Sequence, residues 1–556
     1  MNSRLQSIWM YLCYAIAFAG LGFNIYSRIP KITNYPLPIS WSESGRIFNA
    51  YQIYAPLISG EHLSWPWLDP AKSILDGLVL LIPSAQIWMY RFWVNFLFLF
   101  CAAVVSFAVV KKAISFSPLY KEKAKRGITW LLVLLGTLFL LQGPVYYHVL
   151  LGIVAVLWLY DVKKPFFVLF LIMLGSIWEG LCRVNWFIMP ALVASLIYVF
   201  TKPFSEKKPW QYFRWPLAYL LTGAVTSFLT YFIFINVTGY AITFLNPHMD
   251  YPFFLYKLWP NDGFVGLIPG IVLICLPLLL VILYVALKHI HHLHWVRLFT
   301  ITGILTILFA GSTVVSMRAG GGYDLHNFDS LLLLLFICAC FFGLDAISRD
   351  NVKILKKISP AGYQKGEPDY PRKMKPISFA HLRQRFDLKT NDLSMPLANV
   401  VTVFCLLLIP MFSSFSQIHA PLPQIADSDA VIQQVNSIIN EFGQRDRPVL
   451  FIDQRQLLVY KKITQMSIFV PYDKIELMEM AMARNSEYEN QFLSDIKNQK
   501  FSLIVSEVLF QWEKSFTNRD WYENNVWVNA VSLPISTYYE PVFINKDIDL
   551  AIYAPK

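Results

Sequence analysis

Charged residues are scarce in this chain of 556 residues. Asp, Glu, Lys and Arg make up 15% of the sequence and hydrophobic residues 56%, whereas charged residues are about 25% of an average soluble protein. Too few polar side chains are present to cover the surface of so long a chain in water. The composition therefore excludes an ordinary soluble protein and indicates one that exposes much of its surface to lipid.

Several chemical signatures are missing as well. The seven cysteines all lie in or beside apolar segments, with no CxxC pair and no Cys/His spacing suited to zinc, which argues against disulfides and a structural zinc site. No Gly-rich phosphate loop occurs, so nucleotide binding is not indicated. No internal sequence repeat stands out, which argues against a repeat architecture.

Long apolar segments are abundant. The hydrocarbon core of a bilayer is about 30 Å thick and needs about 20 apolar residues per crossing helix. Eleven segments fit this length: residues 8–25, 86–110, 128–143, 146–161, 165–182, 184–201, 215–237, 263–287, 297–317, 328–347 and 397–414. The third and fourth are short and also suit a re-entrant hairpin. The prediction is a membrane all-α domain over residues 1–414.

The basic residues predict the orientation. Residues 1–414 hold 34 Lys and Arg against 18 Asp and Glu, while residues 415–556 hold 13 against 18. Of those 34 Lys and Arg residues, 26 lie in the loops on one side, which include the basic loop 348–396. The opposite loops hold seven, and the remaining one, Arg91, lies within a span. Because positive charge marks the cytoplasmic side, we expect a multi-pass protein of the bacterial cytoplasmic membrane with a cytoplasmic N-terminus. The basic excess belongs to membrane-flanking loops, which argues against nucleic-acid binding.

Residues 415–556 predict a separate water-soluble domain outside the cytoplasm. Three segments with helical spacing and three short apolar strands are expected in it, namely helices over 430–442, 475–483 and 488–496 and strands over 448–453, 501–506 and 549–554. Alternating elements of this kind predict a small three-layer α/β domain of Rossmann-like character.

Ionisable residues near the apolar segments gather on the external side. Each costs about 2.5–3.5 kcal/mol at the centre of a bilayer helix, so each needs a reason. A coupled transporter would place such groups at the midplane beside broken helices, whereas here they crowd one water–lipid boundary. Arginine there would bind the phosphate oxygens of a lipid-borne group. The candidate binding residues are Arg46, Arg91, Glu179, Arg183, Arg318, Asp324, His326, Asn327 and Asp329.

Glu43 is the most interesting acid. It lies in "WSESGR", within the aromatic external loop 26–85, and the sequence that follows predicts a helix with Ser42 or Ser44 as its cap. A lone carboxylate in a pocket walled by tryptophans is a candidate general base. The alternative is a capping residue that pairs with Arg46. Later in the same loop, residues 74–83 are apolar but too short to span, and we expect them to lie in the membrane interface.

Other polar residues have structural explanations. Glu179 and Arg183, four positions apart, would form an intrahelical pair, and the polar residues of "GGGYDLHNFD" would serve as turn formers. Asp69 and Asp76 are expected at a turn and on a solvated face. The histidines of "HIHHLHWVR" have a metal-like spacing, but their place beside basic residues favours an interfacial charge cluster.

The layout resembles the GT-C superfamily of membrane glycosyltransferases, which use sugars linked to polyprenyl phosphate. The likeness rests on the cytoplasmic N-terminus, the large first external loop with an early acid, its interfacial helix, some eleven spans and the extracytoplasmic C-terminal domain. "WSESGR", "SILDGLVLLIPSAQIWMYRFW", "GLCRVNWF" and "GGGYDLHNFD" are also similar to segments of bacterial glycosyltransferase-like membrane proteins. Where many members carry an aspartate or an acidic pair, this chain has the lone Glu43.

The resemblance implies an inverting transfer from a polyprenyl-phosphate-linked sugar to an acceptor of unknown kind. Glu43 would deprotonate the acceptor, and Arg183, Arg318 or Arg91 would offset the charge that grows on the leaving phosphate. Asp324, His326 and Asn327 would shape the sugar or acceptor pocket. No cofactor is assigned, and a divalent cation stays open.

Two other functions remain open on the sequence alone. The first is a flippase or exporter of a lipid-linked saccharide, which would need a polar groove across the membrane. The second is a non-catalytic membrane scaffold that acts through residues 415–556. A transferase instead requires that the external acids and arginines share one hollow that is open to lipid and to the exterior.

Overall fold

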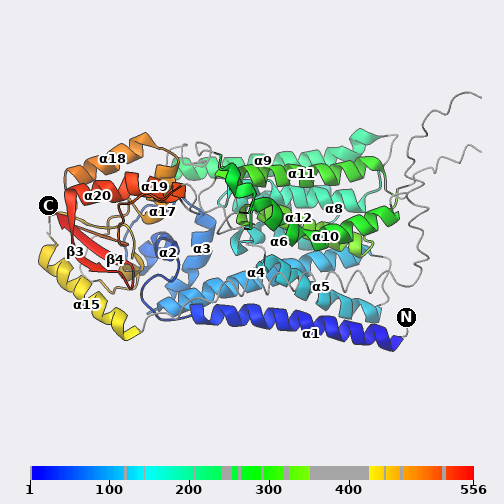
Figure 1. Ribbon diagram of the computed structural model, residues 1–556. Coiled ribbons are helices and arrows are strands. Elements are labelled where there is room, and N and C mark those ends of the chain that lie inside the picture. The colour runs from blue at the N-terminus through cyan, green and yellow to red at the C-terminus, as the bar shows by residue number, and fades with distance from the viewer. Residues whose placement is uncertain are drawn as a thin grey trace, which may run out of the picture.

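The protein forms a bundle of long helices with a small α/β domain at one end (Figure 1). The N-terminus lies at the end of the bundle farthest from that domain. The computed structural model describes residues 3–117, 122–142, 145–204, 208–239, 253–260, 265–289, 293–318, 325–350, 425–443, 446–463, 468–515 and 521–556.

The bundle and its loops are almost entirely helical. The α-helices are α1 (Ser3–Arg28), α2 (Glu43–Ile58), α3 (Pro70–Gly77), α4 (Ile87–Phe116), α5 (Glu122–Gln142), α6 (Tyr147–Leu159), α7 (Pro165–Glu179), α8 (Met189–Thr201), α9 (Pro209–Thr238), α10 (Leu267–His289), α11 (Trp295–Arg318) and α12 (Asp329–Gly343). Short 3₁₀ helices between them are η1 (Ile29–Lys31), η2 (Leu78–Leu81), η3 (Val184–Trp186), η6 (Leu255–Leu258) and η8 (Leu325–Phe328).

Seven helical segments within the described residues are long and apolar enough to cross a membrane. They are Tyr11–Lys31, Ile87–Phe116, Val184–Thr201, Pro209–Thr238, Leu267–Ala286, Trp295–Arg318 and Leu325–Gly343, and three shorter apolar helices are Thr129–Leu141, Tyr147–Leu159 and Pro165–Glu179. Each coincides with a predicted segment. The eleventh, 397–414, and nearly all of the basic loop 348–396 lie outside the described residues. These helices indicate a membrane protein.

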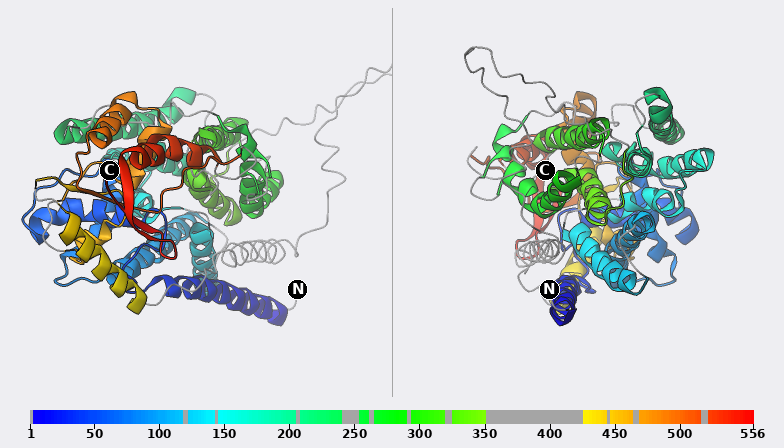
Figure 2. Two further views of the ribbon diagram at one scale, coloured as in Figure 1. Left: turned by 60° about the vertical axis from the view of Figure 1, so that its left-hand side comes forward. Right: turned by 90° about the vertical axis from the view of Figure 1, so that its right-hand side faces the viewer.

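The helices differ in how deeply they are buried. Inside the bundle, 94% of the segment containing α12 and 78% of that containing α8 is buried, against 17% of α9 and 11% of α11. Viewed nearly along the helices, α1 lies at the edge of the bundle (Figure 2, right). The peripheral helices therefore present large apolar side chains outward, as lipid contact requires.

Arg297 braces the end of the bundle that faces away from the α/β domain. Its guanidinium is buried, donates to the carbonyls of Val199 and Phe200 at 2.9 Å each, and pairs with Asp350 at 3.0 Å. Asp350 also accepts the backbone N–H of His294 at 2.7 Å. His294 therefore adjoins the Arg297–Asp350 pair through its backbone, while residues 290–292 of that histidine segment lie outside the described residues.

The α/β domain is a three-layer unit around a mixed sheet. Its elements are α15 (Ile425–Phe442), β1 (Val449–Phe451), α16 (Gln456–Val459), α17 (Lys474–Met482), α18 (Ser486–Lys497), β2 (Leu503–Ser506), α19 (Trp521–Trp527), the π-helical segment η9 (Val528–Ser532), α20 (Leu533–Tyr538), β3 (Tyr539–Asn545) and β4 (Leu550–Pro555). The strand order is β1-β2-β4-β3, with β1 and β2 parallel and the other pairs antiparallel. In Figure 1, α15 covers one face and α18 and α20 the other.

The three predicted strands are confirmed as β1, β2 and β4, but β3 was not predicted. Strand β3 is an edge strand with a mostly exposed pattern and an irregular register between Pro541 and Phe543. Proline cannot donate to a ladder and is confined to edges and bulges, so this strand lacks the apolar run of a central one. Since only one strand pair is parallel, the Rossmann-like description holds for the layers and is wrong for the sheet.

The long first loop, which links α1 to α4, is built into the α/β domain. Tyr35 and Leu37 pack in the hydrophobic core beneath α15. At the start of α2 no side-chain bond from Ser42 caps the helix; the Ser44 hydroxyl instead accepts the backbone N–H of Arg455 at 2.8 Å. The Arg455 guanidinium lies 4.8 Å from the ring centre of Phe48 in α2. These contacts hold the domain over the bundle end that carries α2 and α3.

Candidate functional site

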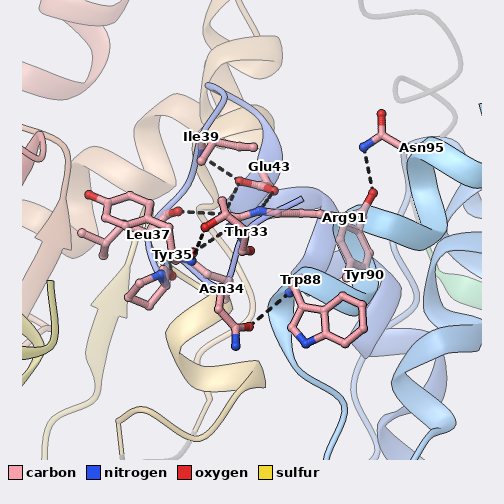
Figure 3. Close-up of polar contacts among 12 residues, drawn as sticks. Thr33, Asn34, Tyr35, Leu37, Ile39, Glu43, Trp88, Tyr90, Arg91 and Asn95 are labelled. Carbon is pink, nitrogen blue, oxygen red and sulfur yellow. Dashed lines mark hydrogen bonds and ion pairs between the residues drawn. The ribbon is translucent and has the colours of Figure 1, made fainter. Parts of the chain in front are cut away.

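Glu43 is locked in a buried ion pair at the start of α2 (Figure 3). The Arg91 guanidinium from α4 donates to both of its carboxylate oxygens, Nε to Oε1 at 2.8 Å and Nη2 to Oε2 at 3.0 Å. Ile39 adds a backbone N–H at 2.7 Å. Arg91 also donates to the carbonyls of Tyr35 and Leu37, at 2.7 and 2.9 Å. The pair therefore fastens the first loop to α4.

This arrangement favours a positioning role for Glu43. A guanidinium does not give up its proton in a protein, and a backbone amide gives up none, so the partners of this carboxylate cannot exchange protons with it. The partner is Arg91, not the Arg46 that the sequence suggested. Tyr460 of the α/β domain is an electrostatic neighbour of the same pair.

Asp76 forms a second buried polar centre, in the loop segment α3. Its carboxyl group is 1% exposed and accepts bonds from Lys72 Nζ at 2.9 Å, from the Tyr90 hydroxyl at 3.2 Å and from the Tyr147 hydroxyl. The expectation that Asp76 lies on a solvated face was wrong. Unlike the partners of Glu43, an ammonium group and two phenols can all release or accept a proton.

Arg46 stands beside this centre. Its electrostatic neighbours are Asp76, Tyr90, Tyr147 and Tyr146. Within the described residues no hydrogen bond or ion pair joins its half-buried guanidinium to another side chain. A guanidinium held among phenols, with its donors unused, is suited to an incoming anion. Of the external arginines proposed for phosphate binding, Arg46 is thus better placed than Arg91.

Lys72 shares the positive field of Arg46. Burial lowers the pKa of the Lys72 ammonium, the Asp76 carboxylate raises it, and the nearby Arg46 lowers it again, with a net decrease from its ordinary value. The group is therefore less firmly protonated than a surface lysine. An added anion between Lys72 and Arg46 would favour the charged form.

Residues 146–148 join the Asp76 centre to a third group of polar side chains. Tyr146 contacts the rings of His148 and His326, at centroid distances of 5.6 and 6.1 Å, and its ring lies 5.4 Å from the Arg183 guanidinium. Tyr147, the next residue, bonds to Asp76. The two centres are therefore adjacent at one end of the bundle.

Arg183 organises the third group. It donates to the Asn327 side-chain oxygen at 3.1 Å and pairs with Asp329 at 3.6 Å, the first residue of α12. Asn185 also donates to Asp329, at 3.4 Å. The intrahelical alternative for Arg183 was wrong, because the side chain turns from the α7–α8 connection to α12 and not to Glu179.

Several buried polar atoms at this end have no hydrogen-bond partner within the described residues. They include both ring nitrogens of His148, both carboxylate oxygens of Glu179 and the side-chain nitrogen of Asn327. The Glu179 carboxylate fits against the backbone of Gly152, where a Cβ would lie 2.0 Å from its Oε1. Buried unsatisfied atoms are rare in native proteins and call for a ligand, water or ion.

The chain matches no family model, no curated protein and no solved structure. The site is therefore interpreted from its own geometry.

Most of the predicted site residues converge, but in two arrangements. Arg46, Arg183, His326, Asn327 and Asp329 surround Tyr146 and its neighbours, together with Glu179 as an electrostatic neighbour of Asp329. Glu43 and Arg91 form the separate brace. Arg318 ends α11, with its guanidinium 4.0 Å from the ring centre of Phe253. Asp324 lies outside the described residues.

No group of three or more His, Cys, Asp or Glu side chains within the described ranges could hold a metal ion. Asp76 is paired with Lys72 and two phenols, and Asp329 with Arg183, and these donors suit an anionic or hydroxylated ligand.

An apolar groove of about 570 Å³ runs along α12, from Leu331 near Asp329 to Phe342. It runs between α10, α11 and α12, and Leu331, Leu335 and Phe342 form its α12 wall. Leu331 is two residues after Asp329, on a different face of the same helix. The ring centre of Phe328, just before α12, lies 6.0 Å from that of Phe309 in the groove wall, so one end of the groove lies near the level of the polar centres.

Four residues of the site were not predicted from the sequence, namely Asp76, Lys72, Tyr90 and Tyr147. A signal was present: Lys72 and Asp76 are four apart in a helix too short to span, which places them on one face. Their burial could not be inferred, because it depends on α4 and α6 closing over α3.

Proposed function

We propose that this protein is a membrane glycosyltransferase that moves a sugar from polyprenyl phosphate to an acceptor at the outer face of the cytoplasmic membrane. The observation that carries the proposal is the buried carboxyl group of Asp76 beside a guanidinium, Arg46, that has no side-chain partner in the described part of the chain. A base and an anion site placed together at the end of an apolar bundle are what this transfer needs.

The phosphate of the donor would bind between Arg46 and Lys72. Both side chains lie in the first external loop and face the same carboxyl group, so an anion there would complete a balanced set of charges. Charge grows on the phosphate as the glycosidic bond breaks, and preorganised donors in a water-poor site stabilise that charge most. Arg183 is held by Asn327 and Asp329 and would support the sugar end.

Asp76 would act as the general base, in place of Glu43. The acceptor hydroxyl loses its proton to the Asp76 carboxylate as its oxygen bonds to the anomeric carbon. At the same time the bond from that carbon to the phosphate oxygen breaks, and polyprenyl phosphate leaves with the bonding electron pair. The phenol of Tyr147 already donates to Asp76 and can carry the proton between acceptor and carboxylate.

The prenyl chain would lie in the groove between α10 and α12. Its lining is aliphatic and aromatic, including Leu279, Leu331 and Phe309, and its outer side opens toward the lipid-facing surfaces of α10 and α11. Burying an isoprenoid chain there would gain the usual hydrophobic free energy of about 25 cal/mol per Å². The α/β domain, fixed to α2 by Arg455, would cover the polar end and meet the acceptor.

Donor turnover tests the proposal. Purified protein in liposomes, supplied with radiolabelled polyprenyl-phosphate sugars and a mixture of envelope acceptors, is expected to release polyprenyl phosphate and to transfer the label. Movement of intact donor between leaflets without release would instead identify a flippase. If the protein neither releases polyprenyl phosphate from any donor nor moves any donor between leaflets, the scaffold hypothesis remains and the proposal is overturned.

Replacing Arg46 by alanine is expected to weaken binding of polyprenyl phosphate by about 10- to 150-fold, since hydrogen bonds to charged groups contribute about 1.5–3 kcal/mol. Binding of a short-chain prenyl phosphate can be measured by calorimetry in detergent. The matched control is Arg214→Ala, which removes an exposed guanidinium that stacks on Trp215. Equal affinities for wild type and Arg46→Ala would remove Arg46 from the phosphate site.

A further inference from the structure

The α/β domain touches the bundle at a second place, away from the first loop. The ring centre of Tyr522 in α19 lies 4.8 Å from that of Phe254, and Glu523 pairs with the buried Lys257 at 3.4 Å. Phe254 donates its backbone N–H to the carbonyl of Met317, in the last turn of α11. Helix α19 is therefore held at the level where a long apolar helix ends, which is the level of the lipid headgroups.

Large apolar side chains are exposed at this level. Leu255 and Trp259, in and after η6, are 63 and 61% exposed, and Trp512 of the α/β domain is 68% exposed. Leu255 and Trp259 belong to the connection between α9 and α10, two helices whose outward faces are apolar. An exposed patch of large apolar side chains marks an interaction site.

The loop that carries Trp512 is held firmly against α19. Asn524 donates to the carbonyl of Trp512 at 3.3 Å, and the Asn525 side chain both accepts from the backbone N–H of Lys514 at 2.7 Å and donates to its carbonyl at 3.1 Å. The neighbouring Glu513 is drawn back to Asn529 at 2.7 Å. Before Trp512, the backbone N–H of Leu509 donates to the Tyr553 hydroxyl at 2.9 Å, so hydrogen bonds hold the backbone on both sides of Trp512.

We propose that the α/β domain rests on the bilayer through this patch, Leu255, Trp259 and Trp512, with the indole of Trp512 in the headgroup region. The η6 segment packs against α10 and α11, and its continuity with their apolar outward faces selects lipid as the occupant of the patch. Tryptophan prefers this zone because its ring is apolar and its N–H is polar. The domain is then held at three places: the first loop, the Lys257–Glu523 pair and the membrane surface.

This contact does not depend on the proposed enzyme activity. It fixes the height of the α/β domain above the bilayer, so it would limit how far the domain can lift from the bundle end. A loosely tethered domain would lack such a fixed height.

Site-specific fluorescence tests the contact. Trp512→Cys is labelled with an environment-sensitive fluorophore in full-length protein in liposomes, with Cys405 replaced by serine because the six other cysteines are buried. The matched control is Ile544→Cys, which labels a 47% exposed position on β3, an edge strand of the sheet. Thermal unfolding of each variant confirms that it is folded.

Lipids that carry a spin label near the headgroup are expected to quench the probe at 512 at least threefold more than the probe at 544, and more than lipids labelled deep in the chain. Equal quenching at the two positions would overturn the proposal. The proposal would also be overturned if the probe at 512 were protected from water-soluble quenchers but not quenched by lipid. That result would assign the patch to a second copy of the chain or to another protein.

Discussion

Asp76→Asn is expected to lower the rate of sugar transfer by about 10²- to 10⁴-fold, the range that general base catalysis contributes. The substitution keeps the size of the side chain, and the amide oxygen can still accept from Lys72, but an amide cannot accept the proton of the acceptor hydroxyl. Because the cationic groups of Arg46 and Lys72 stay in place, the affinity for polyprenyl phosphate should change little. The measurements are kcat with a saturating donor and a binding isotherm for the product lipid.

Glu43→Gln is the matched control, because it makes the same isosteric change in the other buried carboxyl group of the first loop. Its Oε1 can still accept from Arg91, so we expect transfer to fall less than tenfold in protein that remains folded. The opposite ranking, with Glu43→Gln inactive and Asp76→Asn active, would return the general base to Glu43 and refute the assignment made from the hydrogen-bond partners.

Arg91→Leu is expected to lower the free energy of unfolding by about 3–5 kcal/mol, the usual effect of leaving one member of a buried ion pair without its partner. Arg91 also donates to three carbonyls of the segment 33–37, so the loop loses its attachment to α4. Thermal unfolding in detergent should show a transition at markedly lower temperature, and residues 33–43 should become open to proteolysis.

The control for Arg91 is Arg28→Leu, which also removes a guanidinium from the same end of the bundle. Arg28 bonds only to Asn24 and Asn95, at 3.0 and 3.2 Å, among the contacts in the described structure. We expect a loss of about 1 kcal/mol for it. An unfolding temperature for Arg91→Leu no lower than that of Arg28→Leu would show that the Glu43–Arg91 pair does not brace the loop.

Apolar runs predicted the helices well because a span is a local property of about 20 residues. The predicted segments 86–110 and 297–317 coincide with α4 and α11, and the strands β1, β2 and β4 follow the apolar runs of the tail. Burial of one polar residue is not local. Asp76 is buried only because α4 and α6 supply Tyr90 and Tyr147, which no spacing within the first loop reveals.

Pairing of charges was the least predictable feature. Neighbours in sequence suggested Glu43 with Arg46 and Glu179 with Arg183, whereas the observed partners lie 48 and 146 positions apart, in Glu43–Arg91 and Arg183–Asp329. Where few charges are present, a long side chain can reach a partner on another helix. Spacing within one helix then predicts ion pairs poorly. The same reasoning explains why Arg46, expected to pair with Glu43, has no hydrogen bond or ion pair to a side chain in the described part of the chain.

Photocrosslinking of the donor tests the central claim most directly, that Arg46, Lys72 and Asp76 form the site for the lipid phosphate. A prenyl phosphate with a diazirine on its first isoprene unit should label α3 (Pro70–Gly77) and residues 145–148, and unlabelled polyprenyl phosphate should compete for both. The account would be contradicted if labelling were confined to other segments. It would also be contradicted if excess polyprenyl phosphate did not reduce the labelling of these two segments.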